Sequence, residues 1–230
     1  MYRMSGNFLK ILIFLLLVYA FSLSKIATAA LKCEEIKKIP TTSKVIALTF
    51  DDGPDPDITP RILEILYKNN IKATFFVVGE KALLHSSILK DIYAQGHTIG
   101  NHSFSHIALD DKDKSTIKKE ILLTNLIIKI LTNSEPNIFR APYYRCSKTL
   151  NNVLKEMKIK HIGYTYADFN KKTKSSDFIK FIINNLTPGM IILIHEHKNI
   201  SFGYDKRPTV FILEELIQEI KQRGYEFVSF

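Results

Sequence analysis

The sequence predicts an α/β fold, a distorted (β/α) barrel of seven to eight parallel strands that is TIM-barrel-like in architecture. Short, β-branched apolar segments alternate with amphipathic helical segments, and the links between them are short. Strands joined in this way form a parallel sheet covered by helices. The 230 residues, 46% of them hydrophobic, suit one core and leave little room for a second domain.

Seven strands are expected along the chain, at residues 44–50, 73–78, 97–101, 138–140, 161–166, 190–194 and 225–230. Helices are expected to begin at Thr59 and to cover residues 87–95, 115–133, 149–158, 176–185 and 208–222. Thr59 is expected to cap the first helix, with Pro60 in its first turn. Seven strands are one fewer than a complete barrel needs, so the barrel is expected to be distorted or open.

The amino-terminal residues 1–30 are typical of an export signal. Two basic residues precede an apolar run at 11–23, and Ala-Thr-Ala at 27–29 offers a cleavage site. The run is shorter than the roughly 20 residues that span a bilayer, although an uncleaved membrane anchor is the alternative. In both cases the main domain is exported: secreted, cell-wall associated or membrane-anchored. Residues 31–43 are expected to form a polar linker.

Only two cysteines are present, Cys33 and Cys146. An exported protein can join them in a disulfide, and two free thiols are the alternative. Lipid modification of Cys33 is disfavoured by the neighbouring Lys32.

The formal net charge is +9, and removal of residues 1–29 takes away three basic residues and no acidic one, which leaves +6. Such a charge can draw an exported protein to an anionic cell wall or membrane surface. A solvated lysine-rich surface is the alternative. No nucleic-acid motif accompanies the charge.

Reactive side chains follow the carboxyl ends of the predicted strands, which is where parallel barrels carry their chemistry. They are Asp51, Asp52, His102, His106, Arg140, Asp168 and His195.

Asp52, His102 and His106 form a candidate metal site. The two histidines are spaced i and i+4, so they can converge on one ion, and neutral imidazole is a standard zinc ligand. Asp51 points away from its neighbour on an extended chain and can face the reacting atom. The alternatives are an ordinary Asp-Gly-Pro turn and two surface histidines.

Arg140 can hold a carboxylate in a bidentate grip, and gripping Asp51 would keep that acid ionised and aimed. Pro142 fixes the following backbone, so the Tyr143 amide can serve as an oxyanion donor. His195 ends an apolar strand and is placed to act as a general acid. A surface salt bridge for Arg140 and a core histidine for His195 are the alternatives.

Together these segments resemble the polysaccharide deacetylase family, carbohydrate esterase family 4, also called the NodB-homology domain. The resemblance rests on residues 49–54 (Thr-Phe-Asp-Asp-Gly-Pro), the pair His102 and His106, residues 140–143 and residues 193–195. It covers residues 44–230, which it identifies as the catalytic domain. It implies that Asp51 is the base and that Asp52, His102 and His106 are the metal ligands.

One motif departs from the family pattern, which has Asp-x-x-Asp-Trp after the fifth strand. Here the chain reads Tyr-Ala-Asp-Phe-Asn at 166–170, and the protein contains no Trp. Asp168 and Phe169 can stand in for Asp-Trp, with Asp168 orienting His195 and Phe169 walling the groove. Alternatively, Asp168 matches the earlier Asp of the motif and the later pair is lost.

The expected activity is metal-dependent removal of N-acetyl groups from a cell-wall or extracellular polysaccharide, peptidoglycan or chitin-like, with release of acetate. Zn²⁺ is the expected ion, with Co²⁺, Ni²⁺ or Mn²⁺ as alternatives. The expected partner is a polysaccharide or oligosaccharide, and the expected state is a monomer. The rival interpretations are an O-acetyl (xylan-type) esterase and a weak or inactive carbohydrate-binding protein on the same scaffold.

Overall fold

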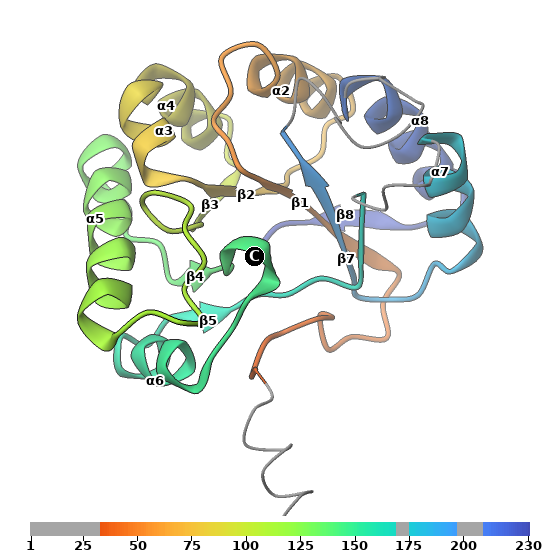
Figure 1. The fold of residues 1–230 in the computed structure, drawn as a ribbon. Helices are drawn as coiled ribbons and strands as arrows, with labels where there is room; N and C mark the ends of the chain where they lie inside the picture. Colours follow the sequence, from red (N-terminus) through yellow and green to blue (C-terminus); the bar gives the residue numbers. More distant parts are fainter. Residues whose placement is uncertain (1–32, 169–174, 197–208) are drawn as a thin grey trace, which may run out of the picture.

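The computed structural model describes residues 33–168, 175–196 and 209–230, which form a strongly curved sheet surrounded by helices (Figure 1). Eight strands make the sheet, in the order β5-β4-β3-β2-β1-β7-β6, with β8 paired to β1. Every pairing between these strands is parallel. The strands are β1 (Val45–Asp51), β2 (Thr74–Val77), β3 (Thr98–Asn101), β4 (Ile138–Phe139), β5 (Lys160–His161), β6 (Tyr166–Ala167), β7 (Met190–His195) and β8 (Glu226–Val228). The distorted barrel is therefore confirmed.

Helices cover the outside of this sheet (Figure 1). They are α2 (Thr59–Lys68), α3 (Gly79–Leu84), α4 (Ser86–Ala94), α5 (Lys114–Thr132), α6 (Lys148–Glu156), α7 (Ser175–Asn184) and α8 (Thr209–Gln222), with a short 3₁₀ turn, η1, at Pro142–Tyr144.

Alternation along the strands separates the helix-covered face from the barrel interior. On β1, Ile46, Leu48 and Phe50 join the large apolar cluster beneath the helices. Ala47 instead joins a small interior cluster with Ile191 of β7. Because side chains alternate, Thr49 and Asp51 continue the interior face of Ala47, and His195 continues that of Ile191. The period of two therefore aims the polar ends of both strands into the barrel.

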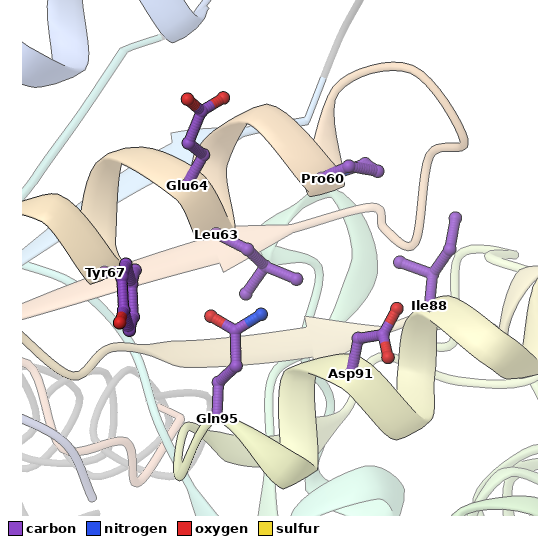
Figure 2. Close-up of a pocket in the computed structure, with 7 residues that line it drawn as sticks. All are labelled: Pro60, Leu63, Glu64, Tyr67, Ile88, Asp91 and Gln95. Carbon is purple, nitrogen blue, oxygen red and sulfur yellow. The ribbon is translucent and has the colours of Figure 1, made fainter.

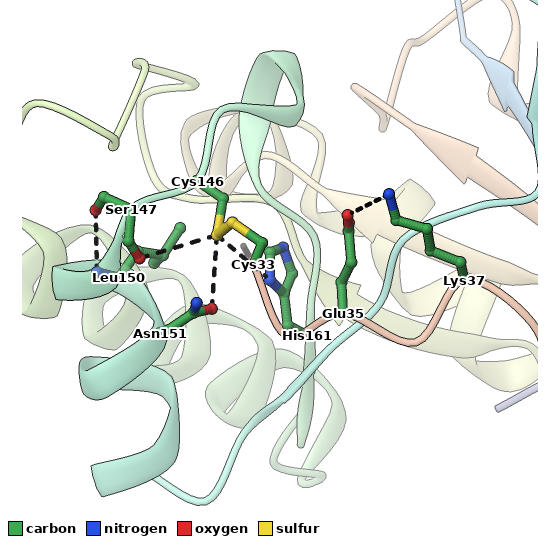
Figure 3. Close-up of a disulfide and its surroundings, with 8 residues drawn as sticks. All are labelled: Cys33, Glu35, Lys37, Cys146, Ser147, Leu150, Asn151 and His161. Carbon is green, nitrogen blue, oxygen red and sulfur yellow. Dashed lines mark hydrogen bonds and ion pairs between the residues drawn. A yellow bond between two sulfur atoms is a disulfide. The ribbon is translucent and has the colours of Figure 1, made fainter. Parts of the chain in front are cut away.

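The amino-terminal segment before β1 lies against the sheet where β5 and β6 are separated. Ile36 bridges to Ile162 in parallel fashion, and Lys38 bridges to Met190 in antiparallel fashion. A disulfide between Cys33 and Cys146 ties this segment to the loop before α6, with Cα atoms 6.0 Å apart (Figure 3). Of the two open possibilities for the cysteines, the structure thus adopts the bridge.

Three local predictions were wrong. The strand expected at 161–166 is two strands, because the chain leaves β5 to pair with Ile36 and then joins β7 through β6. Helix α3 was not expected. Thr59 does not cap α2, since its hydroxyl accepts the Asp55 amide at 2.7 Å and donates to Glu196.

Two further observations concern the surface and the leader. A hollow of about 460 Å³ lies between α2 and α4 (Figure 2), and none of the reactive side chains lines it. Within the described residues, no helix combines the length and apolarity that a membrane span requires. The expected signal or anchor at 1–30 lies outside the described residues.

Candidate active site

Strand register brings two of the reactive side chains together. In the β1–β7 ladder, Asp51 is the direct partner of His195. Asn101 of β3 pairs with Phe139 of β4, so the loops that carry His102 and Arg140 leave the sheet side by side. All these positions lie at the carboxyl ends of parallel strands, as the sequence predicted.

Asp52, His102 and His106 converge. One ligand atom from each lies within 4.8 Å of the others. Oδ1 of Asp52 is 3.3 Å from Nε2 of His102 and 3.0 Å from Nε2 of His106. Burial alone would raise the pKa of Asp52, but hydrogen bonds and charge from the two histidines outweigh it and hold that pKa well below its usual range. The carboxylate is therefore charged and ready to bind a cation.

The surroundings of His102 determine that its Nδ1 carries a hydrogen. Nδ1 lies 2.8 Å from the carbonyl oxygen of Arg140. A carbonyl only accepts, so Nδ1 carries a hydrogen, and Nε2 is left as the ring atom that faces Asp52 and can bind an ion. Such an outer hydrogen bond is what orients metal-binding histidines in known centres. The donor set, two imidazoles and a carboxylate, fits a zinc-type divalent ion.

Arg140 is completely buried and holds Asp51, as predicted. The grip is not bidentate, however. Nη1 donates to Oδ1 of Asp51 at 2.7 Å and to the Thr49 hydroxyl at 2.8 Å. Its other two nitrogens donate to backbone carbonyls. Nε donates to the carbonyl of Ile162 at 3.2 Å, and Nη2 donates to that of Gly163 at 2.8 Å. The guanidinium thus locks Asp51 to the chain between β5 and β6.

His195 is paired with Asp168. Nδ1 of His195 lies 2.6 Å from Oδ1 of Asp168, and the backbone amide of His195 donates to Oδ2 at 2.9 Å. Burial alone would lower the pKa of His195, but the Asp168 carboxylate outweighs it and raises the pKa to about 9. His195 is therefore a cation at neutral pH, with a proton to give. Phe169, expected beside Asp168, lies outside the described residues.

Residues 142–144 form the wall beside His106. Pro142 is buried, whereas Tyr143 is 61% exposed and its ring centroid is 4.7 Å from that of His106. Tyr143 and Tyr144 both adopt positive φ values, 58° and 56°. The Tyr144 ring meets that of Tyr164 edge-on at 4.0 Å. The exposed Tyr143 ring therefore borders the metal centre on this side.

Glu196 is a buried carboxylic acid that the sequence analysis missed. It is 2% exposed, accepts the Thr59 hydroxyl, and donates its backbone amide to the Asp51 carbonyl at 3.1 Å. Burial raises the pKa of Glu196 to about 8. A Cβ on Gly53 would come within 2.0 Å of its Oε1. The absence of a side chain at Gly53 thus lets the carboxyl group pack beneath the Asp51–Asp52 turn.

Comparison with known proteins agrees with this geometry. Residues 38–162, more than half of the chain, match the family model described as polysaccharide deacetylase. The chain belongs to the polysaccharide deacetylase family. Its membership confirms the resemblance read from the motifs and, with it, the expected class of hydrolase.

Three relatives illustrate the family. A Bacillus cereus peptidoglycan-N-acetylglucosamine deacetylase is 34% identical over 83% of this chain and 68% of its own length. A family 4 acetyl xylan esterase from Clostridium thermocellum, solved in complex with a cobalt ion, is 36% identical with a TM-score of 0.72, over 81% of this chain and 88% of that one. A mutant of a CE4 family pseudoenzyme with restored enzymatic activity is 26% identical with a TM-score of 0.74, over 85% of this chain and 69% of that one.

Proposed function

We propose that the chain removes N-acetyl groups from N-acetylglucosamine in peptidoglycan, at the bacterial cell wall. The observation that carries the proposal is the convergence of Asp52, His102 and His106 beside a buried Asp51 and a cationic His195. This arrangement supplies a cation site, a base and an acid at one rim of the barrel.

Asp52, His102 and His106 would hold the divalent ion, most simply Zn²⁺. Such an ion polarises an acetyl carbonyl and makes a bound water acidic. Asp51 takes a proton from the attacking water, and Arg140 keeps its carboxylate aimed at that water. The Tyr143 amide donates to the oxygen on which negative charge develops.

His195 completes the reaction. The water oxygen forms a bond to the acetyl carbon, and the bond from that carbon to the sugar nitrogen breaks. His195 gives its proton to the departing nitrogen, and Asp168 stabilises the imidazolium until that transfer. The products are acetate and a free amino sugar, so the wall polymer gains a positive charge.

Peptidoglycan is favoured over other acetylated glycans by the Bacillus relative and by the expected export of the chain. Tyr143 and Tyr144 offer aromatic faces for sugar rings in place of the tryptophan that the chain lacks.

The second candidate is an O-acetyl esterase, which the 36% identical xylan esterase favours. An ester releases an alcohol, a better leaving group than an amine, so it depends less on a proton from His195. Loss of His195 therefore distinguishes the two reactions.

The experiment is acetate release from peptidoglycan, acetylated chito-oligosaccharides and acetylated xylan, with and without a chelator. We expect chelator-sensitive release from the N-acetylated glycans and a loss of about 10²–10⁴-fold for Asp51→Asn, which should still bind metal. Release from xylan alone would favour the esterase. No release from any of them would support a carbohydrate-binding protein.

A further inference from the structure

The loop that carries His102 and His106 has an unusual backbone. Ser103 and His106 adopt left-handed conformations, with φ of 65° and 54°, although neither is glycine. Such conformations cost energy for residues with side chains and persist only where their surroundings impose them. Two neighbouring elements, α3 and α5, contact the loop and can impose them.

Helix α3 holds the carbonyl groups of the loop. The amide of Gly79 donates to the Ser103 carbonyl at 2.9 Å, and that of Glu80 donates to the Phe104 carbonyl at 3.0 Å. The amides of Phe104 and Ser105 point the other way, toward α5.

Glu120 of α5 receives them. Its Oε2 accepts the amides of Phe104 and Ser105, both at 2.9 Å, and its Oε1 accepts the Ser105 hydroxyl at 2.8 Å. The residue is only 8% exposed, and it is not one of the three groups that converge on the ion. The carboxylate therefore accepts three hydrogen bonds from the two residues that precede His106.

We infer that Glu120 is a positioning residue of the metal centre, because it fixes the backbone of residues 104–105 and thereby holds His106 against Asp52. Without this carboxylate, the loop would keep its contacts to α3 but lose those on the opposite side. Binding of the ion would then have to order His106, and this lowers the affinity for the ion. His102 would be affected less, because its Nδ1 is held by the carbonyl of Arg140.

The test measures Zn²⁺ affinity by competition with a chromophoric chelator, and the visible spectrum of the Co²⁺ form. Glu120→Ala is expected to weaken Zn²⁺ binding about 10–100-fold and to alter the Co²⁺ spectrum. Glu120→Gln is expected to lose less, since its amide oxygen can accept both backbone amides while its amide nitrogen donates to Ser105. The matched control is Ile128→Ala, which removes a buried core side chain of the same helix. It should lower Tm and leave metal affinity unchanged.

A double-mutant cycle makes the mechanism specific. If Glu120 acts through His106, then Glu120→Ala should add no further loss of affinity in a His106→Ala background. Equal affinity losses for Glu120→Ala and Ile128→Ala, or an undiminished effect of Glu120→Ala when His106 is absent, would overturn the inference. Circular dichroism checks folding, and Glu120→Asp takes the place of the alanine variant if that variant does not fold.

This inference rests on the metal centre of the proposed function and not on deacetylation. An inactive protein that bound metal through His106 would leave it standing. A wild-type chain that bound no divalent ion would overturn both.

Discussion

Nη1 of Arg140 lies 2.7 Å from Oδ1 of Asp51, in an ion pair whose side chains are 0% and 1% exposed. Arg140 also spans from Thr49 on β1 to the carbonyls of Ile162 and Gly163. The charge of Arg140 is balanced, and these contacts lie inside the barrel. Arg140 therefore contributes both to the stability of the fold and to the orientation of the Asp51 carboxylate.

Arg140→Met should therefore destabilise the protein as well as inactivate it. Removal of one partner leaves Asp51 as an uncompensated buried charge, which costs about 3–5 kcal/mol. Urea denaturation measures the loss. The control is Arg145→Met, which breaks the pair between the exposed Arg145 and the half-buried Asp110 at the surface and should cost at most about 1 kcal/mol. Similar losses for the two variants would contradict the structural role assigned to Arg140.

Asp168→Asn should change the pH dependence of turnover. The pKa of His195 is raised to about 9 by Asp168, so a protonated His195 is available below that pH and activity should fall as pH rises through it. Without the carboxylate, the fall should move toward the ordinary histidine value of about 6.5. The kcat–pH profile measures the shift, with Asp177→Asn, at an exposed residue of α7, as control. An unmoved alkaline limb would contradict the proton-donor role.

The same shift affects folding. Since the folded pKa of His195 lies above its unfolded value, its pairing with Asp168 stabilises the fold fully below about 6.5, and that contribution is lost as pH rises through about 9.

Gly53→Ala should lower both stability and activity. The added Cβ would lie 2.0 Å from Oε1 of Glu196, so the Asp51–Asp52 turn or Glu196 must move. Glu196→Ala removes the obstructing carboxyl group. The double variant Gly53→Ala with Glu196→Ala should therefore lose less stability than the two single variants added together. Thermal melts of the wild type, the two single variants and the double variant test this. Strict additivity would contradict a steric clash between the added Cβ and Glu196.

Loss of the disulfide should also be measurable. Cys33 and Cys146 are 113 residues apart, and closing a loop of that size is worth up to roughly 4–5 kcal/mol. Cys33→Ser with Cys146→Ser should lower Tm and reduce turnover. The bridge anchors Ile36, whose backbone pairs with His161 and Gly163 next to the carbonyls that hold Arg140. A reductant should reproduce the effect in the wild type and have none on the double variant.

The sequence was most informative where chemistry and strand ends coincide. Asp51, Asp52, His102, His106 and His195 follow apolar strands, so their meeting at one rim follows from parallel topology alone. Of the two interpretations left open for the altered motif, the one that paired Asp168 with His195 agrees with their direct contact.

The supporting contacts were not predictable in the same way. Glu120 lies in an ordinary amphipathic helix, and only the fold shows that the His102–His106 loop passes over it. Thr59 carries a typical capping signal, yet Glu196, 137 residues away, takes its hydroxyl. The pairing of residues 36–39 with the sheet depends on where β5 and β6 separate, which local pattern does not reveal.

The most direct test of the proposed site is a titration of the metal-free protein with Zn²⁺ while acetate release from an N-acetylated glycan is followed. Activity should rise in proportion to bound metal and level off at one equivalent per chain. Zn²⁺ binding and acetate release should fall together in each of the variants Asp52→Ala, His102→Ala and His106→Ala. Acetate release that is full without metal, or metal binding that survives all three substitutions, would contradict it.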